Sequence, residues 1–355
     1  MSKRIYSLDV LRGVAIAIML LLDAPPDDLF EILEHAPWAG LTVADLAFPL
    51  FAFAMGTSAA ISMSRREIST KKILRRVTIL FALGFFLNVL PIICAGEIFF
   101  DVRLFGVLQR LALTYALGIF VVKIFRHEFG ILIAAFALLI VSSAGFHIYA
   151  PENPFDEAHN ISGAVDLIFP GANHIYTATN DPEGLYGTFA GTSSVLFGFL
   201  AGKILIDNAT SRDKIFILGA AGVLLLIAGG LWTNFDIVSK NLWTAPFALI
   251  NAGIDLIFLA LLVKFVDNSS QKKIFRPFCA LGKNPLFFFM ANNVVLTILF
   301  AIPCGDTNFY LWLYRHTTQG IFSPEFGATL FCVLWCVMWL PLAELFYRRN
   351  ITIKL

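Results

Sequence analysis

The stretches SLDVLRGVAIAIMLLLD at 7–23 and EHAPWAGLTVADLAFPLFAFAMG at 34–56 decide the fold, because both are apolar enough for a membrane and yet hold ionisable side chains. Even lenient insertion scales put the cost of an ionised group at the centre of a bilayer at about 2.5 kcal/mol. Asp9, Arg12, Asp23, His35 and Asp45 all lie in or beside these stretches. We therefore expect some of them to be functional.

The composition assigns the whole chain to the membrane class. Of the 355 residues, 58% are hydrophobic and 14% are charged, and the mean hydropathy is +0.78, whereas soluble domains carry about 25% charged residues. A helix needs about 20 mostly apolar residues to cross the hydrocarbon layer. Ten windows approach or reach that length: 6–23, 41–63, 73–93, 104–125, 129–149, 185–206, 214–232, 243–265, 278–302 and 327–346. We predict an all-α polytopic membrane protein with about ten transmembrane helices in one domain, 1–355.

Basic residues set the predicted orientation, because short loops rich in Lys and Arg stay in the cytoplasm. With ten spans and both termini cytoplasmic, most of the 26 Lys and Arg residues fall on the cytoplasmic side, including the run RREISTKKILRR at 65–76. His35 and the acidic loop at about 150–184 then face outside. The first span has no small-residue cleavage site after it, so we expect no cleaved signal peptide.

The cysteines and the glycines predict no metal or nucleotide motif. The five cysteines, at 94, 279, 304, 332 and 336, lack the spacing of zinc ligands. Cys94 and Cys304 both fall near the predicted outer face and could pair; the alternative is that the cysteines are small buried residues. No glycine-rich phosphate loop or dinucleotide fingerprint is present. We expect no metal and no nucleic-acid partner.

Polar residues gather at the predicted outer ends of the spans when they are sorted by depth at about 1.5 Å per residue. They are Asp23, His35, Asp45, Gln109, Arg110, Asp181, Glu183, Lys240, Asn241 and Trp243. The set predicts an outer vestibule with a base, carboxylates, cations and an aromatic platform for a polar substrate. Structural roles stay open, because Asp181 and Glu183 can cap a helix and Trp243 can anchor the chain at the membrane interface.

The cytoplasmic side carries a different set. In LGKNPLFFFMANN at 281–293, Lys283 and Asn284 lie just inside the ninth window, and Pro285 interrupts the helix there. Arg12 lies in the first window and can pair with Asp9. With the basic run at 65–76, these residues predict a binding site for a phosphorylated cofactor. The alternative is that the cations only follow the positive-inside rule.

Six stretches resemble the heparan-alpha-glucosaminide N-acetyltransferase family, the transmembrane acetyltransferases of lysosomes and their shorter bacterial relatives. In the family's order they are SLDVLRGVAI (7–16), HAPWAGLTVADLAFPLFAFAMG (35–56), GVLQRLALTY (106–115), DPEGLYGTFAGTSSVLFGFLAG (181–202), KNLWTAPF (240–247) and LGKNPL (281–286). The resemblance implies the family's helical fold, acetyl-CoA as a co-substrate reached from the cytoplasm, and an amino-sugar acceptor on the far side. It implies that His35 is catalytic and that the chain resides in the inner membrane of a bacterium, and it leaves a homodimer open.

Two positions depart from the family's pattern. Asp23 stands where the family commonly has asparagine, and an ionised carboxylate accepts hydrogen bonds but donates none. Stabilisation of an oxyanion by an amide at this position is therefore in doubt. Lys283 stands where relatives can be uncharged.

The layout suits transfer from a thioester, which requires a base, close positioning of two reactants and stabilisation of an oxyanion. Histidine suits the first task because its unperturbed pKa of about 6.5 lies near working pH. We expect Asp23 to orient the His35 ring, as the acid of a triad does. His35 can act as a direct base or can carry the acetyl group itself. A transporter of a polar solute and an acyltransferase of a cell-envelope glycan hydroxyl remain alternatives.

Overall fold

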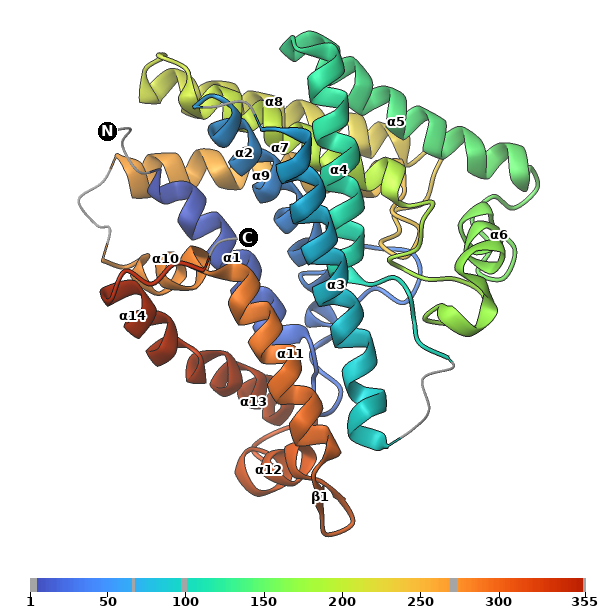
Figure 1. Ribbon diagram of the computed structural model, residues 1–355, viewed down its shortest axis with the longest axis vertical. Helices are drawn as coiled ribbons and strands as arrows, with labels where there is room; N and C mark the ends of the chain where they lie inside the picture. The colour runs from blue at the N-terminus through green and yellow to red at the C-terminus, as the bar shows by residue number, and fades with distance from the viewer. Residues whose placement is uncertain (1–4, 66–67, 97–100, 269–272, 354–355) are drawn as a thin grey trace.

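The computed structural model describes residues 5–65, 68–96, 101–268 and 273–353, and these form a helical bundle (Figure 1). The α-helices are α1 (Tyr6–Leu22), α2 (Ala47–Met63), α3 (Thr70–Ala95), α4 (Val107–Phe125), α5 (Glu128–Tyr149), α6 (Ile161–Asp166), α7 (Thr188–Ile206), α8 (Ser211–Trp232), α9 (Ala245–Leu262), α10 (Arg276–Lys283), α11 (Pro285–Ala301), α12 (Phe309–Thr317), α13 (Pro324–Met338) and α14 (Leu340–Arg348). Short 3-10 or π segments are η1 (Glu31–Leu33), η2 (Ala44–Leu46), η3 (Leu167–Gly171), η4 (Ala172–His174) and η5 (Val263–Asp267). Strands β1 (Pro303–Cys304) and β2 (Thr307–Asn308) form one antiparallel hairpin.

Several of these helices start at a residue whose side chain caps the first turn. Thr210 accepts a hydrogen bond from the Asp213 amide at the start of α8, and Ser323 accepts one from the Phe326 amide at the start of α13. Such caps satisfy backbone donors that the first helical turn leaves without partners. The long apolar runs behind the caps then continue as α-helix, because a bilayer offers no other partner for their backbone groups.

The all-α polytopic architecture predicted from composition is confirmed. Among the described residues, eight helical segments are long and apolar enough to cross a membrane, or nine if the bent pair α10 and α11 is one span. α1 fills the first predicted window, but its 17 residues fall short of a full span. α13 and α14 together form one span, as α9 and η5 do. The number of ten spans therefore stays a prediction.

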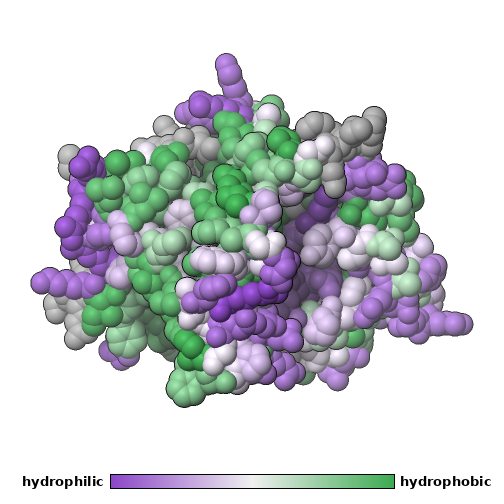
Figure 2. Space-filling model, turned by 90° about the horizontal axis from the view of Figure 1, so that it is seen from below, coloured by the Kyte–Doolittle hydropathy of each residue, from purple (hydrophilic) through white to green (hydrophobic). Residues whose placement is uncertain are grey.

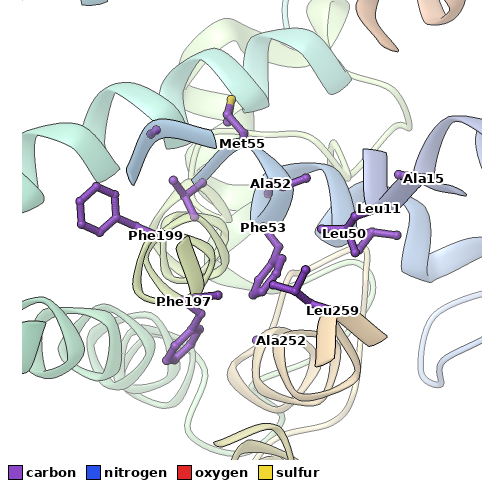
Figure 3. Packing of buried hydrophobic residues seen from close by; sticks show 14 of the residues in the cluster. Leu11, Ala15, Leu50, Ala52, Phe53, Met55, Phe197, Phe199, Ala252 and Leu259 are labelled. Carbon is purple, nitrogen blue, oxygen red and sulfur yellow. The ribbon is translucent and has the colours of Figure 1, made fainter. Parts of the chain in front are cut away.

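Glycines let α2 and α7 pack with their backbones in contact at the centre of the bundle (Figure 3). A Cβ atom on Gly56 would lie 1.9 Å from the Val195 carbonyl oxygen, and one on Gly198 would lie 2.0 Å from the Phe53 carbonyl oxygen. The Thr57 hydroxyl also donates to the Gly198 carbonyl across the two helices, at 2.9 Å. Small residues at such contacts are the usual basis of helix association in membranes.

α10 also packs against the first half of α1 through glycines. A Cβ atom on Gly13 would lie 1.8 Å from the Phe278 carbonyl oxygen, and one on Gly282 would lie 1.8 Å from the Asp9 carbonyl oxygen. The start of α1 is also tied to the end of η5, because the Ser7 hydroxyl donates to Asp267 at 2.6 Å.

The break that Pro285 predicts is present as a bend of 82° between α10 and α11. Asn284 occupies the break and binds the C-terminal tail: its amide donates to the Ile351 carbonyl at 3.0 Å, and its side-chain oxygen accepts from the Ile353 amide at 2.7 Å. Because α10 lies on the first half of α1, both described ends of the chain lie at one end of the bundle. The predicted placement of both termini on the cytoplasmic side stays a prediction.

Cys94 and Cys304 lie within the described ranges and do not form the disulfide left open above. Cys94 is exposed, and Cys279 and Cys332 are buried. The burial of Cys279 and of Cys332 fits the interpretation of cysteine as a small apolar residue.

The orientation makes a prediction about labelling. With the native cysteines removed, a cysteine at Ala36 is expected to react with a membrane-impermeant thiol reagent from outside intact cells, and a cysteine at Ser69 only after the cells are opened. The reason is that the basic run beside Ser69 favours the cytoplasm. Mass spectrometry of the labelled peptides measures both sites, and labelling of both positions from outside would overturn the orientation.

Candidate active site

His35 and Asp45 form a hydrogen-bonded pair at the N-terminal end of α2. The Nδ1 atom of His35 lies 2.7 Å from Oδ1 of Asp45, and the His35 side chain is 50% exposed while that of Asp45 is fully buried. The other carboxylate oxygen of Asp45 accepts from the Ala36 amide and from the amide and hydroxyl of Thr42, at 3.1–3.2 Å. Hydrogen bonds within its own loop thus hold the Asp45 carboxylate in place, and the carboxylate in turn orients the His35 ring. Asp45 therefore takes the orienting role that the sequence suggested for Asp23.

Lys240 completes a triad with these two residues. Its Nζ atom lies 3.1 Å from Nδ1 and 3.2 Å from Nε2 of His35, and 3.8 Å from the Asp45 carboxylate. Burial lowers the pKa of the Lys240 ammonium below its ordinary value, and the carboxylates of Glu183, Asp45 and Asp23 act in the opposite direction. The two nearly equal distances place the Lys240 ammonium beside the imidazole ring, to the side of the Nε2 lone pair.

Hydrogen bonds hold the loop of His35 against the loop of Lys240. The Asn241 side-chain amide donates to the Pro37 carbonyl at 2.9 Å, and the Gly40 backbone amide donates to the Val238 carbonyl at 2.7 Å. The Trp38 indole donates to the Phe155 carbonyl at 2.9 Å. The loop of His35 is thereby held by contacts with two other parts of the chain, at Phe155 and at 238–241. Asn241 helps to position His35 through this loop.

Asp23 has different partners from those expected. Its Oδ2 atom accepts from the amides of Asn292 and Asn293 on α11, at 3.0 and 3.1 Å. Asn292 in turn accepts from the Trp335 indole at 2.8 Å. Within the described ranges no hydrogen bond joins Asp23 to His35, so Asp23 links α1 to α11 at this end of the bundle.

Asp181 and Glu183 pair with Arg103. The Arg103 Nε atom donates to Asp181 at 2.8 Å, and its Nη2 atom pairs with both Asp181 and Glu183. Burial by itself lowers the pKa of Arg103, but the hydrogen bonds and charges of the two carboxylates outweigh it and raise that pKa above the ordinary value. Asp181 and Glu183 are therefore both engaged in ion pairs with Arg103.

Asp166 anchors the same loop from α6. Its two carboxylate oxygens accept from the amides of Asp181 and Leu185, both at 3.1 Å. Burial raises the pKa of Asp166 to about 6, although these backbone donors act against the rise. Neither Arg103 nor Asp166 was among the candidates from sequence. The sequence does place Arg103 and the acidic loop at about 150–184 on the same predicted face, and this proximity could have indicated an ion pair.

Arg110 and Trp243 form the buried support beneath these loops. Arg110 Nη2 donates to the carbonyls of Pro182 and Gly184, at 3.0 and 2.7 Å, and its guanidinium lies 5.4 Å from the centre of the Trp243 ring. Trp243 is 1% exposed, so it offers no exposed platform to a sugar. Gln109 is also buried and donates to the Leu104 carbonyl at 3.0 Å.

At the opposite end of α1 and α2 lies a cavity of about 470 Å³. It is lined by Leu8, Arg12, Ser58, Ile61, Ser62 and Arg65. Two guanidinium groups and two hydroxyls suit a phosphate group. Lys283 and Asn284 do not line this cavity: Lys283 Nζ lies 3.1 Å from Oδ1 of Asn350, and Asn284 binds the tail.

The two ends of α1 thus offer different chemistry: arginines and serines at one end, and a histidine with a buried carboxylate and an ammonium at the other. Seen from the end where α12 and the β1–β2 hairpin lie, the surface has apolar residues over much of its area and hydrophilic residues around a hollow (Figure 2). Within the described ranges no group of three His, Cys, Asp or Glu side chains is placed to hold a metal ion. The triad of His35, Asp45 and Lys240 can accept a proton and stabilise negative charge.

Comparison with known proteins gives a consistent result. The family model described as heparan-alpha-glucosaminide N-acetyltransferase, catalytic, matches residues 4–229. Human heparan-alpha-glucosaminide N-acetyltransferase is 26% identical, over all of this chain and 60% of the human protein. The mouse protein of the same name is 26% identical, over 83% of this chain and 54% of the mouse protein. The chain therefore spans less than two thirds of the length of these relatives. His35, Asp45, Arg103 and Asp181 fall inside the matched region, and Lys240 lies beyond it.

Proposed function

Because the chain belongs to the heparan-alpha-glucosaminide N-acetyltransferase family, we propose that it moves an acetyl group from cytoplasmic acetyl-CoA to the amine of an amino sugar on the outer side. The family and the apolar helices make it an integral membrane protein of acetyltransferase type. The acceptor, the donor and the side of each are our proposal. The observation that carries it is a half-exposed histidine, His35, paired with the buried Asp45 at the end of the bundle opposite the arginine-lined cavity.

In the proposed reaction His35 acts as the base. The amine nitrogen attacks the thioester carbonyl carbon, and the carbonyl π electrons move to oxygen. His35 Nε2 takes a proton from the attacking nitrogen while Nδ1–H stays on Asp45, which stabilises the imidazolium. Collapse of the intermediate re-forms the carbonyl and expels the CoA thiolate, which takes the proton from the ring. The products are the acetamide and the free thiol.

The donor is proposed to bind at the cytoplasmic cavity. Arg12 and Arg65 would neutralise its phosphates, and Ser58 and Ser62 would donate hydrogen bonds to them. From Arg12 to Asp23 the helix rises about 16 Å at 1.5 Å per residue. The pantetheine arm must therefore run alongside α1 to bring the thioester to the outer end.

This assignment predicts that Arg65→Gln raises the Michaelis constant for acetyl-CoA by about tenfold or more and leaves that for the acceptor within about twofold. The reason is the loss of a charge-assisted hydrogen bond, which is worth about 1.5–3 kcal/mol. Steady-state kinetics with each substrate varied measures both constants. Arg212→Gln, on the exposed first turn of α8 away from the cavity, is the matched control. Equal effects of the two substitutions would remove the donor from this cavity.

The proposed function is tested with purified protein in liposomes, radiolabelled acetyl-CoA and glucosamine. Labelled N-acetylglucosamine that resists mild alkali is the expected product, because amides survive conditions that cleave esters. A label that mild alkali releases would identify an O-acyltransferase. Uptake of glucosamine without chemical change would identify a transporter. Either of these results would overturn the proposal.

A further inference from the structure

We propose that Asn251 and Asp255, on one face of α9, bind the two amide groups of the pantetheine arm of acetyl-CoA midway between the arginine-lined cavity and His35. The inference rests on the proposed acetyl transfer, and it names the residues that hold the donor inside the bundle. Neither residue was a candidate from the sequence, and neither takes part in the proposed proton transfer. Their role is to bind the arm so that the thioester reaches His35.

Both side chains carry a buried oxygen atom that is free to accept a hydrogen bond. Asn251 is fully buried, and its side-chain amide donates to the Phe247 carbonyl at 2.9 Å, but its Oδ1 atom accepts from no described residue. Asp255 is 3% exposed, and its Oδ2 atom likewise has no donor within the described ranges. A polar group that is buried without a partner costs free energy, and an ionisable residue inside a membrane bundle usually marks a functional site. The two oxygens are therefore available to the donors of a bound molecule.

The two side chains lie on the face of α9 that packs into the bundle. Asn251 and Asp255 are four residues apart, so they share one face of the helix. Ala252 and Leu259, three residues before and four after Asp255, lie on this face beside Phe53 of α2 (Figure 3). α9 also packs against α1, and α1 and α2 supply every lining residue of the arginine-lined cavity except one in the turn after α2. The free oxygens are therefore on the side of the two helices along which the arm must run.

α9 runs from the end of the bundle that holds His35 to the end that holds the cavity. Just before α9 begins, Lys240 contacts His35. Just after it, Asp267 at the end of η5 accepts from the Ser7 hydroxyl at 2.6 Å, and the residue after Ser7 lines the cavity. Asp255 follows ten residues of α9 and precedes Asp267 by twelve, which correspond to about 15 and 18 Å along the helix. Asp255 thus lies about halfway between the two ends.

The pantetheine arm presents its polar groups in the matching order. Its two amides lie between the phosphates and the sulfur, and one β-alanine unit separates them. Each amide has an N–H donor, and the oxygens of Asn251 and Asp255 are acceptors one helical turn apart, about 6 Å along the axis. With the phosphates in the cavity and the thioester at His35, the amides pass this face of α9. The rest of the arm is apolar and suits the aliphatic side chains around it.

The main test compares CoA with adenosine 3′,5′-bisphosphate, which has the phosphorylated nucleoside of CoA but lacks the arm. Equilibrium binding of radiolabelled CoA to the purified protein, with the bisphosphate as competitor, measures both dissociation constants. We expect Asp255→Leu and Asn251→Leu each to weaken CoA binding at least about fivefold, the effect of one lost acceptor in a buried site. Binding of the bisphosphate should stay within about twofold. Asp255→Asn keeps an acceptor oxygen and should bind CoA within about threefold of the wild type.

Two further variants and a stability measurement separate binding of the arm from other effects. Arg65→Gln changes the cavity and should weaken both ligands, since both carry phosphates. Asp306→Leu replaces an aspartate whose side chain is 88% exposed, and it should leave both affinities unchanged. Asp255→Leu should unfold at or above the wild-type temperature, because an apolar group replaces a buried polar one that lacks a partner. If Asp255→Leu weakens both ligands equally, or weakens neither, the inference is wrong.

A labelling experiment on the wild type needs no substitution. Dicyclohexylcarbodiimide reacts with carboxyl groups in apolar surroundings, and peptide mass spectrometry locates the adduct. We expect an adduct at Asp255 that CoA prevents and that saturating adenosine 3′,5′-bisphosphate does not. Equal labelling with the two ligands, or no adduct at Asp255, would overturn the contact. A wild type that binds no CoA would overturn the proposed function together with this inference, whereas CoA binding that is insensitive to Asp255 and Asn251 would remove the inference alone.

Discussion

His35→Ala is expected to lower the turnover of acetyl transfer at least about 100-fold, the usual lower range for the loss of a general base. The substitution removes the group that takes the proton and leaves Asp45 as a buried carboxylate held by Ala36 and Thr42. Because the half-exposed His35 ring adds little to the core, thermal unfolding and acetyl-CoA binding should stay near the wild type. Radiolabelled transfer and calorimetric titration with CoA measure these quantities separately.

The chain supplies a matched control for this experiment. His147 also pairs with a buried aspartate, with its Nε2 atom 2.9 Å from Oδ1 of Asp236, and its side chain is 42% exposed. It lies at the C-terminal end of α5 without a lysine of its own among the described contacts. His147→Ala is therefore expected to keep turnover within about threefold. If His35→Ala retains more than a tenth of wild-type turnover, or if the two alanine variants are equally impaired, His35 is not the base.

Gly198→Val is expected to destabilise the folded protein. Even the Cβ atom would lie 2.0 Å from the Phe53 carbonyl oxygen, so α2 and α7 must separate to admit it. Overpacking usually costs about 1–3 kcal/mol, and a rigid backbone neighbour places this case at the upper end. For a chain of this size, about 3 kcal/mol corresponds to a fall of about 4 °C in the unfolding midpoint. Size-exclusion profiles in detergent and thermal unfolding measure the effect.

Gly230→Val on α8 is the control for the intrinsic effect of valine in a helix. A Cβ atom on Gly230 meets no other atom within 4 Å, and no strained backbone angle requires glycine there. This variant should keep the free energy of unfolding within about 1 kcal/mol of the wild type, because valine is a slightly better helix former than glycine. Comparable losses in the two valine variants would mean that the contact between α2 and α7 is not the cause.

Local patterns in the sequence were sufficient for the main helices and for one break between them. The apolar windows predict the main spans, and Pro285 predicts the break before α11. These features depend on composition over about twenty residues or on one residue with a fixed backbone preference. The reduced length of α1 and the small helix α12 were missed, because window averages do not resolve short amphipathic segments.

The partners within the site depend on contacts between distant parts of the chain. Asp23 binds Asn292, which is 269 residues away, and Arg103 binds Asp181 across 78 residues. Trp243 is buried although a membrane-interface position was equally consistent with its place at the start of a span. Nothing in a single sequence marks such pairs. Even the pairing of His35 with Asp45 depends on a loop conformation that Thr42 helps to fix.

The binding of the tail by Asn284 has a consequence for how the protein is made. Asn284 leaves the ribosome 67 residues before Ile351, so its side-chain amide lacks the Ile351 carbonyl and the Ile353 amide as partners while α11 to α14 are being inserted. A polar side chain without a hydrogen-bond partner is costly in an apolar environment. The nascent chain therefore has to keep Asn284 out of the lipid, against α1 or within the insertion machinery, until Ile351 and Ile353 reach it.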